Sequence, residues 1–263
     1  MRIAFFSDVC PPKIDGVVTH VLETAAALKK RGHTLLAVVP RPARRHLAPD
    51  SPFAEIISLP SVPALVYPEI RLGLPSLALL RLRRFRPEVI HVHTPGTVGI
   101  AAIAAAKLLR VPLVATFHTY VMSKEYLDLI RLGRFEKKLS RLIWGFNNYY
   151  LNHSDVVISP AESVKLDLLK SGVRKKVYVI HNGVDLDDFA PGGEFLAQKA
   201  REKYGLGDKV ILYVGRISKE KSLDVLIKAF GQLVKEAQDA QLLLVGDGPE
   251  RRKLESLTEK EGL

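Results

Sequence analysis

Two cations at a fixed spacing follow a short apolar strand in the second half of the sequence. The strand expected at 210–214 runs into Gly215 and Arg216, and Lys221 precedes a helix expected at 222–236. A departing diphosphate develops negative charge, which fixed Arg and Lys side chains beside a helix start stabilise without a metal ion. The alternative is a solvated charged loop, which would not favour a glycine and an arginine at the strand's end.

A second glycine-rich turn follows the next expected strand, at 241–245, and carries Gly246 and Gly248 before Pro249. Glycine lets a backbone approach a ligand closely because it has no Cβ. This turn is therefore suited to backbone contacts with a nucleotide base.

The turn Asp15-Gly16-Val17 opens the first helix, expected at 16–30. Unpaired N–H groups at a helix start bind phosphate, and Gly16 would let that backbone approach a ligand. The alternative is that Asp15 caps the helix and Gly16 shapes the turn. The turn lacks the Gly-x-Gly-x-x-Gly pattern, which disfavours a nicotinamide cofactor.

His118 ends an apolar strand expected at 113–117, where it could bind a sugar hydroxyl or stabilise developing charge. A lone histidine in such a place is more often structural. Tyr120 and Tyr126 follow closely and either line an acceptor pocket or pack in the core.

His91 and His93 are two residues apart on an expected strand and share a face, as a pair of metal ligands would. No nearby acidic or cysteine residue completes a ligand set. The sequence therefore predicts no metal site.

Strands and helices alternate along the chain, which predicts parallel sheets wrapped by helices on both faces. The fold class is α/β, with two Rossmann-like domains. A turn-rich break at 181–185 separates domain 1–184 from domain 185–263, which has two clear strands and is expected to be incomplete. The expected elements lie as follows: strands at 2–7, 34–39, 55–59, 89–93, 113–117, 155–159, 177–180, 210–214 and 241–245; helices at 16–30, 76–84, 98–109, 135–151, 161–169 and 222–236, with a last one opening at 249.

The composition is that of a soluble globular protein, with 47% hydrophobic and 25% charged residues. The single cysteine, Cys10, excludes an internal disulfide and favours a reducing cytoplasm. The longest apolar stretch, 98–106, is too short to cross a membrane.

The net positive charge of the chain belongs to the first domain. Residues 1–184 hold 26 Lys and Arg against 13 Asp and Glu, whereas the whole chain has a net charge of +11. Such a field attracts an anionic partner, either nucleic acid, an acidic ligand or the anionic cytoplasmic leaflet of a membrane. Nucleic acid is disfavoured because no aromatic platform is interleaved with the cations.

Part of this charge lies beside an apolar stretch, 72–82, whose leucines could rest among lipid headgroups while arginines bind anionic lipid. The alternative is a core helix with a solvated basic face. The arginines concerned are Arg71, Arg81, Arg83 and Arg84.

Taken together, these motifs resemble the glycosyltransferases of family 4, which have the GT-B fold, over the whole chain. The motifs that carry the resemblance are the Gly16-Val17 loop, His91-x-His93-Thr94-Pro95, Phe117-His118-Thr119, Asn182-Gly183-Val184-Asp185 with Phe189-x-Pro191, Val214-Gly215-Arg216 with Lys221, and Gly246-Asp247-Gly248-Pro249. Within the family, the chain is most similar to the bacterial diacylglycerol glucosyltransferases and related glycolipid synthases.

The resemblance implies a retaining transfer of a hexose from a nucleotide-sugar, with UDP-glucose favoured over GDP-mannose, to a membrane lipid such as diacylglycerol. It implies that His118 contacts the transferred sugar in the catalytic centre and that no metal or cofactor is required. The implied donor-binding residues are Gly16, Val17, Gly215, Arg216, Lys221, Gly246 and Gly248. A cytoplasmic protein on the inner face of the membrane follows, whereas a soluble or polysaccharide acceptor, or a non-catalytic membrane-binding fragment, remain the alternatives.

Two features depart from the family pattern. Asp15 stands where many relatives have a second glycine. The family's two glutamates separated by seven residues are expected beyond Leu263, because Glu194 and Glu202, which have this spacing, precede the strand at 210–214. The 263 residues alone are therefore expected to be inactive.

Overall fold

The computed structural model describes residues 1–11, 13, 15–41, 51–63, 71–74, 76–118, 136–186 and 193–263. The chain divides into two compact units, one ending at Asp185 and the other running from Leu186 to Leu263. No helix in the described part of the chain is long and apolar enough to cross a membrane.

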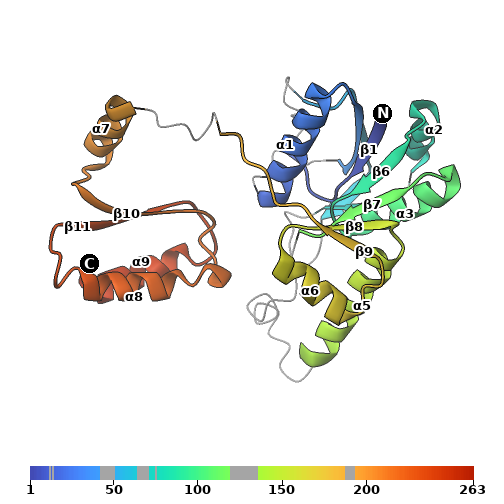
Figure 1. Cartoon of the computed structure of the whole chain (residues 1–263). Helices are drawn as coiled ribbons and strands as arrows, with labels where there is room; N and C mark the ends of the chain where they lie inside the picture. Colours follow the sequence, from blue (N-terminus) through green and yellow to red (C-terminus); the bar gives the residue numbers. More distant parts are fainter. Residues whose placement is uncertain are drawn as a thin grey trace. The chain divides into compact units, whose positions relative to one another are not determined.

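The first unit is built on a seven-stranded parallel sheet with the order β3-β2-β1-β6-β7-β8-β9 (Figure 1). The strand order reverses between β1 and β6, which makes this the switch point where ligands bind beyond the strands' carboxyl ends in such sheets. The strands are β1 (Arg2–Phe6), β2 (Thr34–Pro40), β3 (Glu55–Leu59), β6 (Val89–Val92), β7 (Leu113–Thr116), β8 (Val156–Ser159) and β9 (Lys176–Val179).

Helices cover both faces of this sheet, and successive residues of β1 show why. Ala4 and Phe6 point into the main core, which includes residues of α3, whereas Ile3 and Phe5 pack with α1 on the opposite face. The elements are α1 (Gly16–Lys30), the 3₁₀ helix η1 (Leu77–Leu80), α2 (Arg81–Phe85), α3 (Thr97–Leu109), α5 (Glu136–Asn152) and α6 (Glu162–Ser171).

A short antiparallel hairpin, β4 (Ser61–Pro63) with β5 (Arg71–Gly73), precedes η1. The apolar stretch 72–82 is divided among several elements. Leu72 belongs to β5, and the helix expected at 76–84 is observed as η1 followed directly by α2.

A buried carboxylate joins the loop after β1 to the start of α3. Asp8, 7% exposed, accepts hydrogen bonds from the hydroxyls of Thr94 (2.7 Å) and Thr97 (3.3 Å) and from the Val98 N–H (2.9 Å). Asp8 in turn donates its own N–H to the Thr94 hydroxyl over 2.6 Å. Because Gly96, the N-cap of α3, has no side chain to cap the helix, Asp8 supplies the cap from a distant segment.

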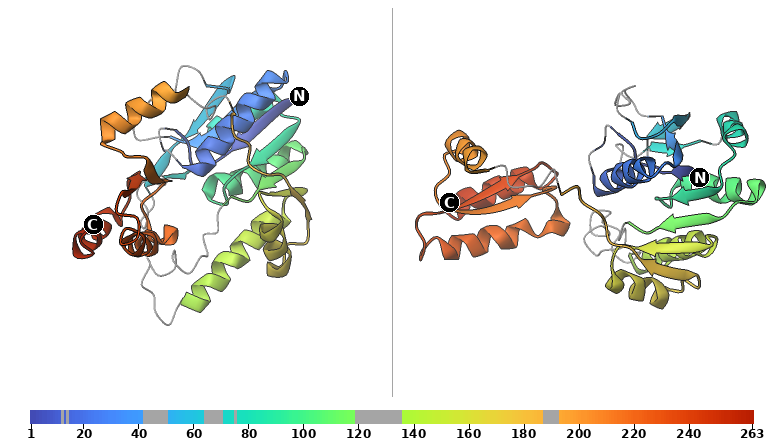
Figure 2. Two further views of the ribbon diagram at one scale, coloured as in Figure 1. Left: turned by 60° about the vertical axis from the view of Figure 1, so that its left-hand side comes forward. Right: turned by 45° about the horizontal axis from the view of Figure 1, so that its top comes forward.

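The second unit contains two parallel strands, β10 (Lys209–Val214) and β11 (Ala240–Val245), in its described part. One face of the pair is covered by α8 (Leu223–Leu233) and α9 (Arg251–Lys260), whose Leu223, Ile227 and Leu254 form a small core (Figure 2). The opposite face is open, since Leu212 is 58% exposed and Val214 68% exposed.

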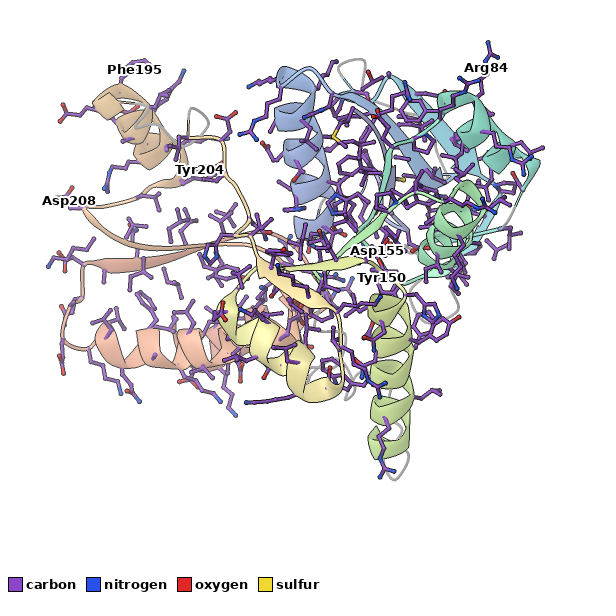
Figure 3. All side chains as sticks on the ribbon, turned by 45° about the vertical axis from the view of Figure 1, so that its right-hand side comes forward. Arg84, Tyr150, Asp155, Phe195, Tyr204 and Asp208 are labelled. Atoms are coloured by element: carbon purple, nitrogen blue, oxygen red, sulfur yellow. The ribbon has the colours of Figure 1, made fainter. Side chains whose placement is uncertain are left out.

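Two further elements of this unit, α7 and η3, precede α8 in the sequence. No element was predicted between residues 185 and 210, but α7 (Gly193–Tyr204) forms there with no buried residue. Phe195 and Tyr204 of α7 are labelled in Figure 3. A short 3₁₀ helix, η3 (Lys219–Lys221), leads into α8 through Ser222, which has a left-handed backbone (φ 50°).

Asp8→Ala should lower the free energy of unfolding by about 2–4 kcal/mol, because three donors lose their acceptor in a buried place. Asp8→Asn should cost less, since its amide oxygen can still accept from Val98 and Thr97. Urea denaturation of the two variants measures the difference. An exposed control on α3, Lys107→Ala, should stay within about 0.5 kcal/mol of the wild type; equal losses for all three variants would refute the capping role.

Candidate active site

Three histidines meet at the carboxyl edge of the first unit's sheet, at its switch point. His20 lies on α1, His93 directly follows β6, and His118 follows β7. The ring centroids of His20 and His118 are 4.6 Å apart, and those of His93 and His118 are 5.4 Å apart. Sequence reasoning selected His118 but did not bring His20 to it, although His20 is one helical turn beyond Gly16 on the same helix.

His93 connects the cluster to the sheet. Its Nδ1 lies 3.1 Å from His118 Nε2, so one of these nitrogens donates a hydrogen bond to the other. The ring is 1% exposed and stacks on Phe5 at 5.0 Å between centroids. Its other nitrogen, Nε2, has no hydrogen-bond partner among the described residues.

Burial keeps these imidazoles neutral. Loss of hydration lowers the pKa of His118 to about 3, with a further contribution from His20, while the nearby Asp15 carboxylate opposes this shift. Burial also lowers the pKa of His93 and His20, and for His20 a hydrogen bond with Asn182 acts in the opposite direction. The site therefore offers uncharged groups that can donate or accept a hydrogen bond near neutral pH.

His91, the second histidine of the strand pair, is held in the sheet. Its Nε2 lies 2.7 Å from Thr116 Oγ1 on the neighbouring β7. Burial lowers the pKa of His91 to about 3 as well. The two-histidine metal pair considered from sequence is therefore not formed by His91, whose ring nitrogen is used inside the sheet.

Of the two roles that the sequence left open for the turn before α1, the structure shows the capping role. Asp15 is the N-cap of α1, accepting from the Val18 N–H at 2.9 Å, and its other oxygen lies 3.0 Å from Lys13 Nζ. Gly16 is exposed, and a Cβ added there would meet no atom within 4 Å, so space for a ligand is present. Val17 packs against the core beneath α1.

In the second unit, two glycine turns bind each other through their backbones. Gly215 N–H donates to Val245 O, and Ile217 N–H donates to Asp247 O. A Cβ on Gly246 would lie 1.8 Å from Gly215 O, and one on Gly248 would lie 2.1 Å from Ile217 O. These glycines are therefore required by the close approach of two loops, which is a reason that the sequence did not supply.

The two cations predicted to bind a diphosphate lie in the segment between β10 and α8, which includes the first of these two turns. Arg216 is exposed at the end of β10, and its carbonyl accepts a 2.9 Å hydrogen bond from the Tyr213 hydroxyl. Lys221 is exposed at the end of η3, directly before α8. Both side chains thus lie at the carboxyl edge of the β10–β11 pair, where ligands bind in such sheets.

The residues predicted for the acceptor side are placed only in part. Tyr120 and Tyr126 lie outside the described residues. The Arg71 guanidinium is occupied by Ser61, with 2.8 Å hydrogen bonds to its hydroxyl and its carbonyl, and Arg81 pairs with Glu55. Arg83 and Arg84 are exposed on α2, and Figure 3 labels Arg84 at the outside of that helix.

Arg83 borders an apolar groove between α2 and α3 with a volume of about 260 Å³. Leu80, Ile100 and Leu108 line it and remain exposed, at 54%, 49% and 65%. Leu82, by contrast, is 1% exposed in the core. Helix α2 therefore has Leu82 in the core and exposed arginines on its outer face, and an apolar surface lies beside these arginines.

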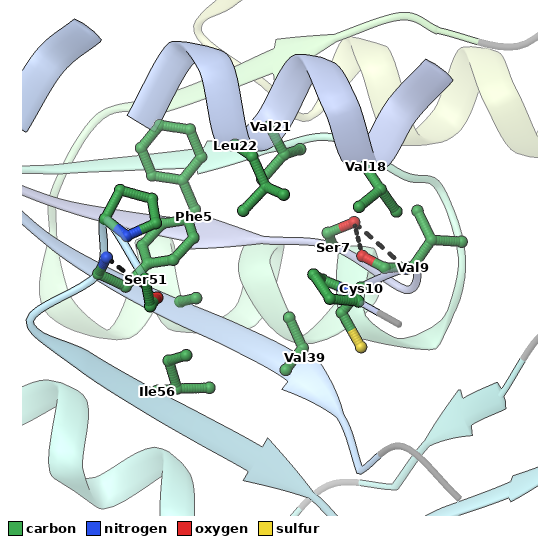
Figure 4. Close-up of a pocket in the computed structure, with 14 residues that line it drawn as sticks. Phe5, Ser7, Val9, Cys10, Val18, Val21, Leu22, Val39, Ser51 and Ile56 are labelled. Carbon is green, nitrogen blue, oxygen red and sulfur yellow. Dashed lines mark hydrogen bonds between the residues drawn. The ribbon is translucent and has the colours of Figure 1, made fainter. Parts of the chain in front are cut away.

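A second apolar cavity, of about 200 Å³, lies under α1 next to the loop after β1 (Figure 4). Phe5, Val21 and Val39 contribute to its lining, and Cys10 borders it; burial raises the pKa of the Cys10 thiol to about 11. Few polar atoms face this cavity, so it offers a sugar hydroxyl little to bind.

The fold and the two carboxyl-edge sites define a GT-B protein with two Rossmann-like units, and the fold class predicted from the sequence is confirmed. Solved structures with this fold include HepE of Anabaena in complex with UDP-glucose (TM-score 0.69, 18% identity, all of this chain and 66% of that one). Another is sucrose-phosphate synthase from Thermosynechococcus elongatus (TM-score 0.70, 18% identity, all of this chain and 68% of that one).

The chain belongs to Glycosyltransferase Family 4, whose sequence model matches residues 14–188. The model for glycosyl transferases group 1 matches residues 196–263. The resemblance inferred from the motifs is therefore confirmed.

Curated relatives include the alpha-monoglucosyldiacylglycerol synthase of Acholeplasma laidlawii, 28% identical over 98% of this chain and 66% of that protein. The GDP-mannose-dependent alpha-mannosyltransferase of Corynebacterium glutamicum is also 28% identical, over 98% of this chain and 60% of that protein. The chain thus spans about two thirds or less of these relatives' length.

Acid should destabilise the protein through the histidine cluster. The pKa of His118 is lower in the folded state than the ordinary value of 6.5, so between pH 6.5 and about pH 3 the unfolded chain binds a proton that the folded chain does not. Stability is therefore present above this window and lost as the pH falls through it, by up to about 1.4 kcal/mol per pH unit for each such histidine.

His118→Asn should make this loss shallower. The measurement is urea denaturation of wild type and variant at a series of pH values from neutral to mildly acidic. The same slope in both proteins would contradict a buried, neutral His118.

Proposed function

We propose that this protein is a retaining glycosyltransferase that moves a hexose from a nucleotide-sugar to a membrane lipid. The observation that carries the proposal is the neutral histidine cluster at the switch point of a family 4 first unit, beside the open backbone of Gly16. A neutral imidazole at this position can form a hydrogen bond with a sugar hydroxyl and adds no charge to the site.

In this proposal His118 contacts the transferred sugar. Its Nε2 is engaged with His93 Nδ1, so its Nδ1 is the nitrogen left for a ligand. Gly16 allows the backbone at the start of α1 to approach the sugar, and Val17 supports this turn from the core side.

Arg216 and Lys221 would neutralise the diphosphate as the glycosyl bond breaks. The glycines Gly215, Gly246 and Gly248 hold the two loops that carry and flank these cations. Because two fixed cations supply the positive charge, we propose that transfer needs no bound metal ion or other cofactor.

The proposed donor is UDP-glucose. The name of the Acholeplasma relative and the UDP-glucose complex of HepE agree with this choice, but a GDP-mannose-dependent relative shares the same 28% identity. Measuring transfer from UDP-glucose and from GDP-mannose decides between the two donors. The kcat/KM of this protein should be far higher for its true donor.

The proposed acceptor is a lipid such as diacylglycerol, at the anionic inner face of the membrane. Two observations support it: the exposed Arg83 and Arg84, and the apolar groove beside them with exposed Leu80, Ile100 and Leu108. Apolar side chains that enter the headgroup region and arginines that bind anionic lipid are the two parts of a peripheral membrane site.

His118→Ala in the full-length protein should lower kcat for transfer to diacylglycerol in mixed vesicles by about 10²-fold or more, because a polar contact to the reacting sugar is lost. Radiolabelled donor and lipid extraction measure the rate. His153→Ala, at the end of α5, is the matched control and should keep the wild-type rate. Wild-type turnover by the His118 variant would sink the assigned role.

Arg83→Ala with Arg84→Ala should weaken binding to vesicles that contain anionic lipid by roughly 30-fold, at about 1 kcal/mol per arginine. The control has the same charge change in the second unit, Lys235→Ala with Arg252→Ala, both exposed. Sedimentation at low and high salt measures the affinity. Wild-type protein that fails to sediment even at low salt would favour a soluble acceptor instead.

A further inference from the structure

The fold completes a ligand set that the sequence does not show. His20, His93 and His118 each offer one ring nitrogen, and these three nitrogens all lie within 4.8 Å of one another. They come from three separate elements, so no local spacing reveals them. The pair considered from sequence, His91 with His93, is replaced by a set of three in which His91 takes no part.

The distances suit a tetrahedral ion. With Zn–N bonds of about 2.0–2.1 Å, two imidazole nitrogens on one tetrahedral zinc lie about 3.3 Å apart. His93 Nδ1 and His118 Nε2 are already 3.1 Å apart. Only His20 has to move. Its ring is partly exposed on α1, where it has a long 3.4 Å contact with Thr24 and a hydrogen bond with Asn182.

The ligand type favours a transition-metal ion. Three neutral imidazoles suit ions such as Zn²⁺, whereas Mg²⁺ and Ca²⁺ prefer oxygen ligands. The nearby carboxylate of Asp15 is committed to the Val18 N–H and to Lys13. Three histidines leave a fourth zinc position for water, as in zinc sites with one open coordination place.

We propose that His20, His93 and His118 bind Zn²⁺, and that the bound ion inhibits the transferase. The binding rests on the geometry alone, and the inhibition rests also on the proposed function. The ion takes His118 Nε2, the nitrogen that otherwise bonds to His93, and so adds a positive charge to the ring whose Nδ1 would contact the transferred sugar. It therefore opposes donor binding and takes no part in the reaction.

The first test measures binding without any assay of activity. Metal-free full-length protein is titrated with Zn²⁺ by calorimetry, and with Co²⁺ while the visible ligand-field bands of a four-coordinate ion are recorded. One equivalent should bind. His20→Ala and His118→Ala should each weaken binding at least about tenfold, and neither side chain belongs to the hydrophobic core.

Two control variants exclude other zinc ligands. Cys10→Ser removes the single thiol, and His153→Ala removes a histidine outside the cluster; both should bind Zn²⁺ like the wild type. Absence of binding, or binding that survives both His20→Ala and His118→Ala, overturns the site. Loss of binding in Cys10→Ser does the same, since it would place the ion on sulfur.

The second test measures transfer at increasing Zn²⁺ with and without a chelator. Inhibition should be reversed by the chelator and should raise the apparent KM for the nucleotide-sugar rather than lower kcat. If one equivalent of Zn²⁺ binds through the histidines but the transfer rate is unchanged, the proposed inhibition is wrong and the proposed zinc site stands. A protein with no transfer under any condition contradicts the proposed function instead, because the binding test stands without it.

Discussion

The buried carboxylate of Asp8 is the constraint on which the carboxyl edge of the first unit depends. It ties the loop after the central strand β1 to the start of α3, and so sets the path of the segment that leaves His93. The contact is close: a Cβ on Gly96 would lie 2.5 Å from the Asp8 carboxyl carbon. Burial raises the pKa of the Asp8 carboxyl, and the hydrogen bonds from Thr94, Thr97 and Val98 oppose this shift by stabilising its charged form. These bonds fix the relative positions of the two segments.

Rigidity and neutrality together define the chemistry of the histidine cluster. His93 is buried and stacks on Phe5, and the partly buried rings of His20 and His118 pack against it and against each other. Charged imidazolium would be costly there, so the cluster presents lone pairs and N–H groups. Such groups suit a sugar hydroxyl and also a soft metal ion, and the same geometry therefore underlies both proposals.

Most of the first unit could be predicted from the sequence because its elements are periodic and apolar. Helix α1 was predicted at its observed bounds, and the predicted strands agree with β1, β2 and β6 within a residue. The β4–β5 hairpin was missed because strands of three residues carry no periodicity and this one is fixed by the Arg71 contacts with Ser61. Helix α7 was missed because it buries no apolar stripe. His20 and Asp8 could not be assigned, since their partners are brought to them only by the sheet.

The cap that Asp8 provides for α3 also sets the order in which the molecule can form. Val98 lies 90 residues after Asp8 along the chain, so the cap requires two distant segments, those that follow β1 and β6, to come together. Contacts between residues so far apart in sequence form late in folding, because the entropy cost of closing a long loop comes before the contact stabilises the chain. A chain emerging from the ribosome therefore has its first helices well before it has its histidine cluster.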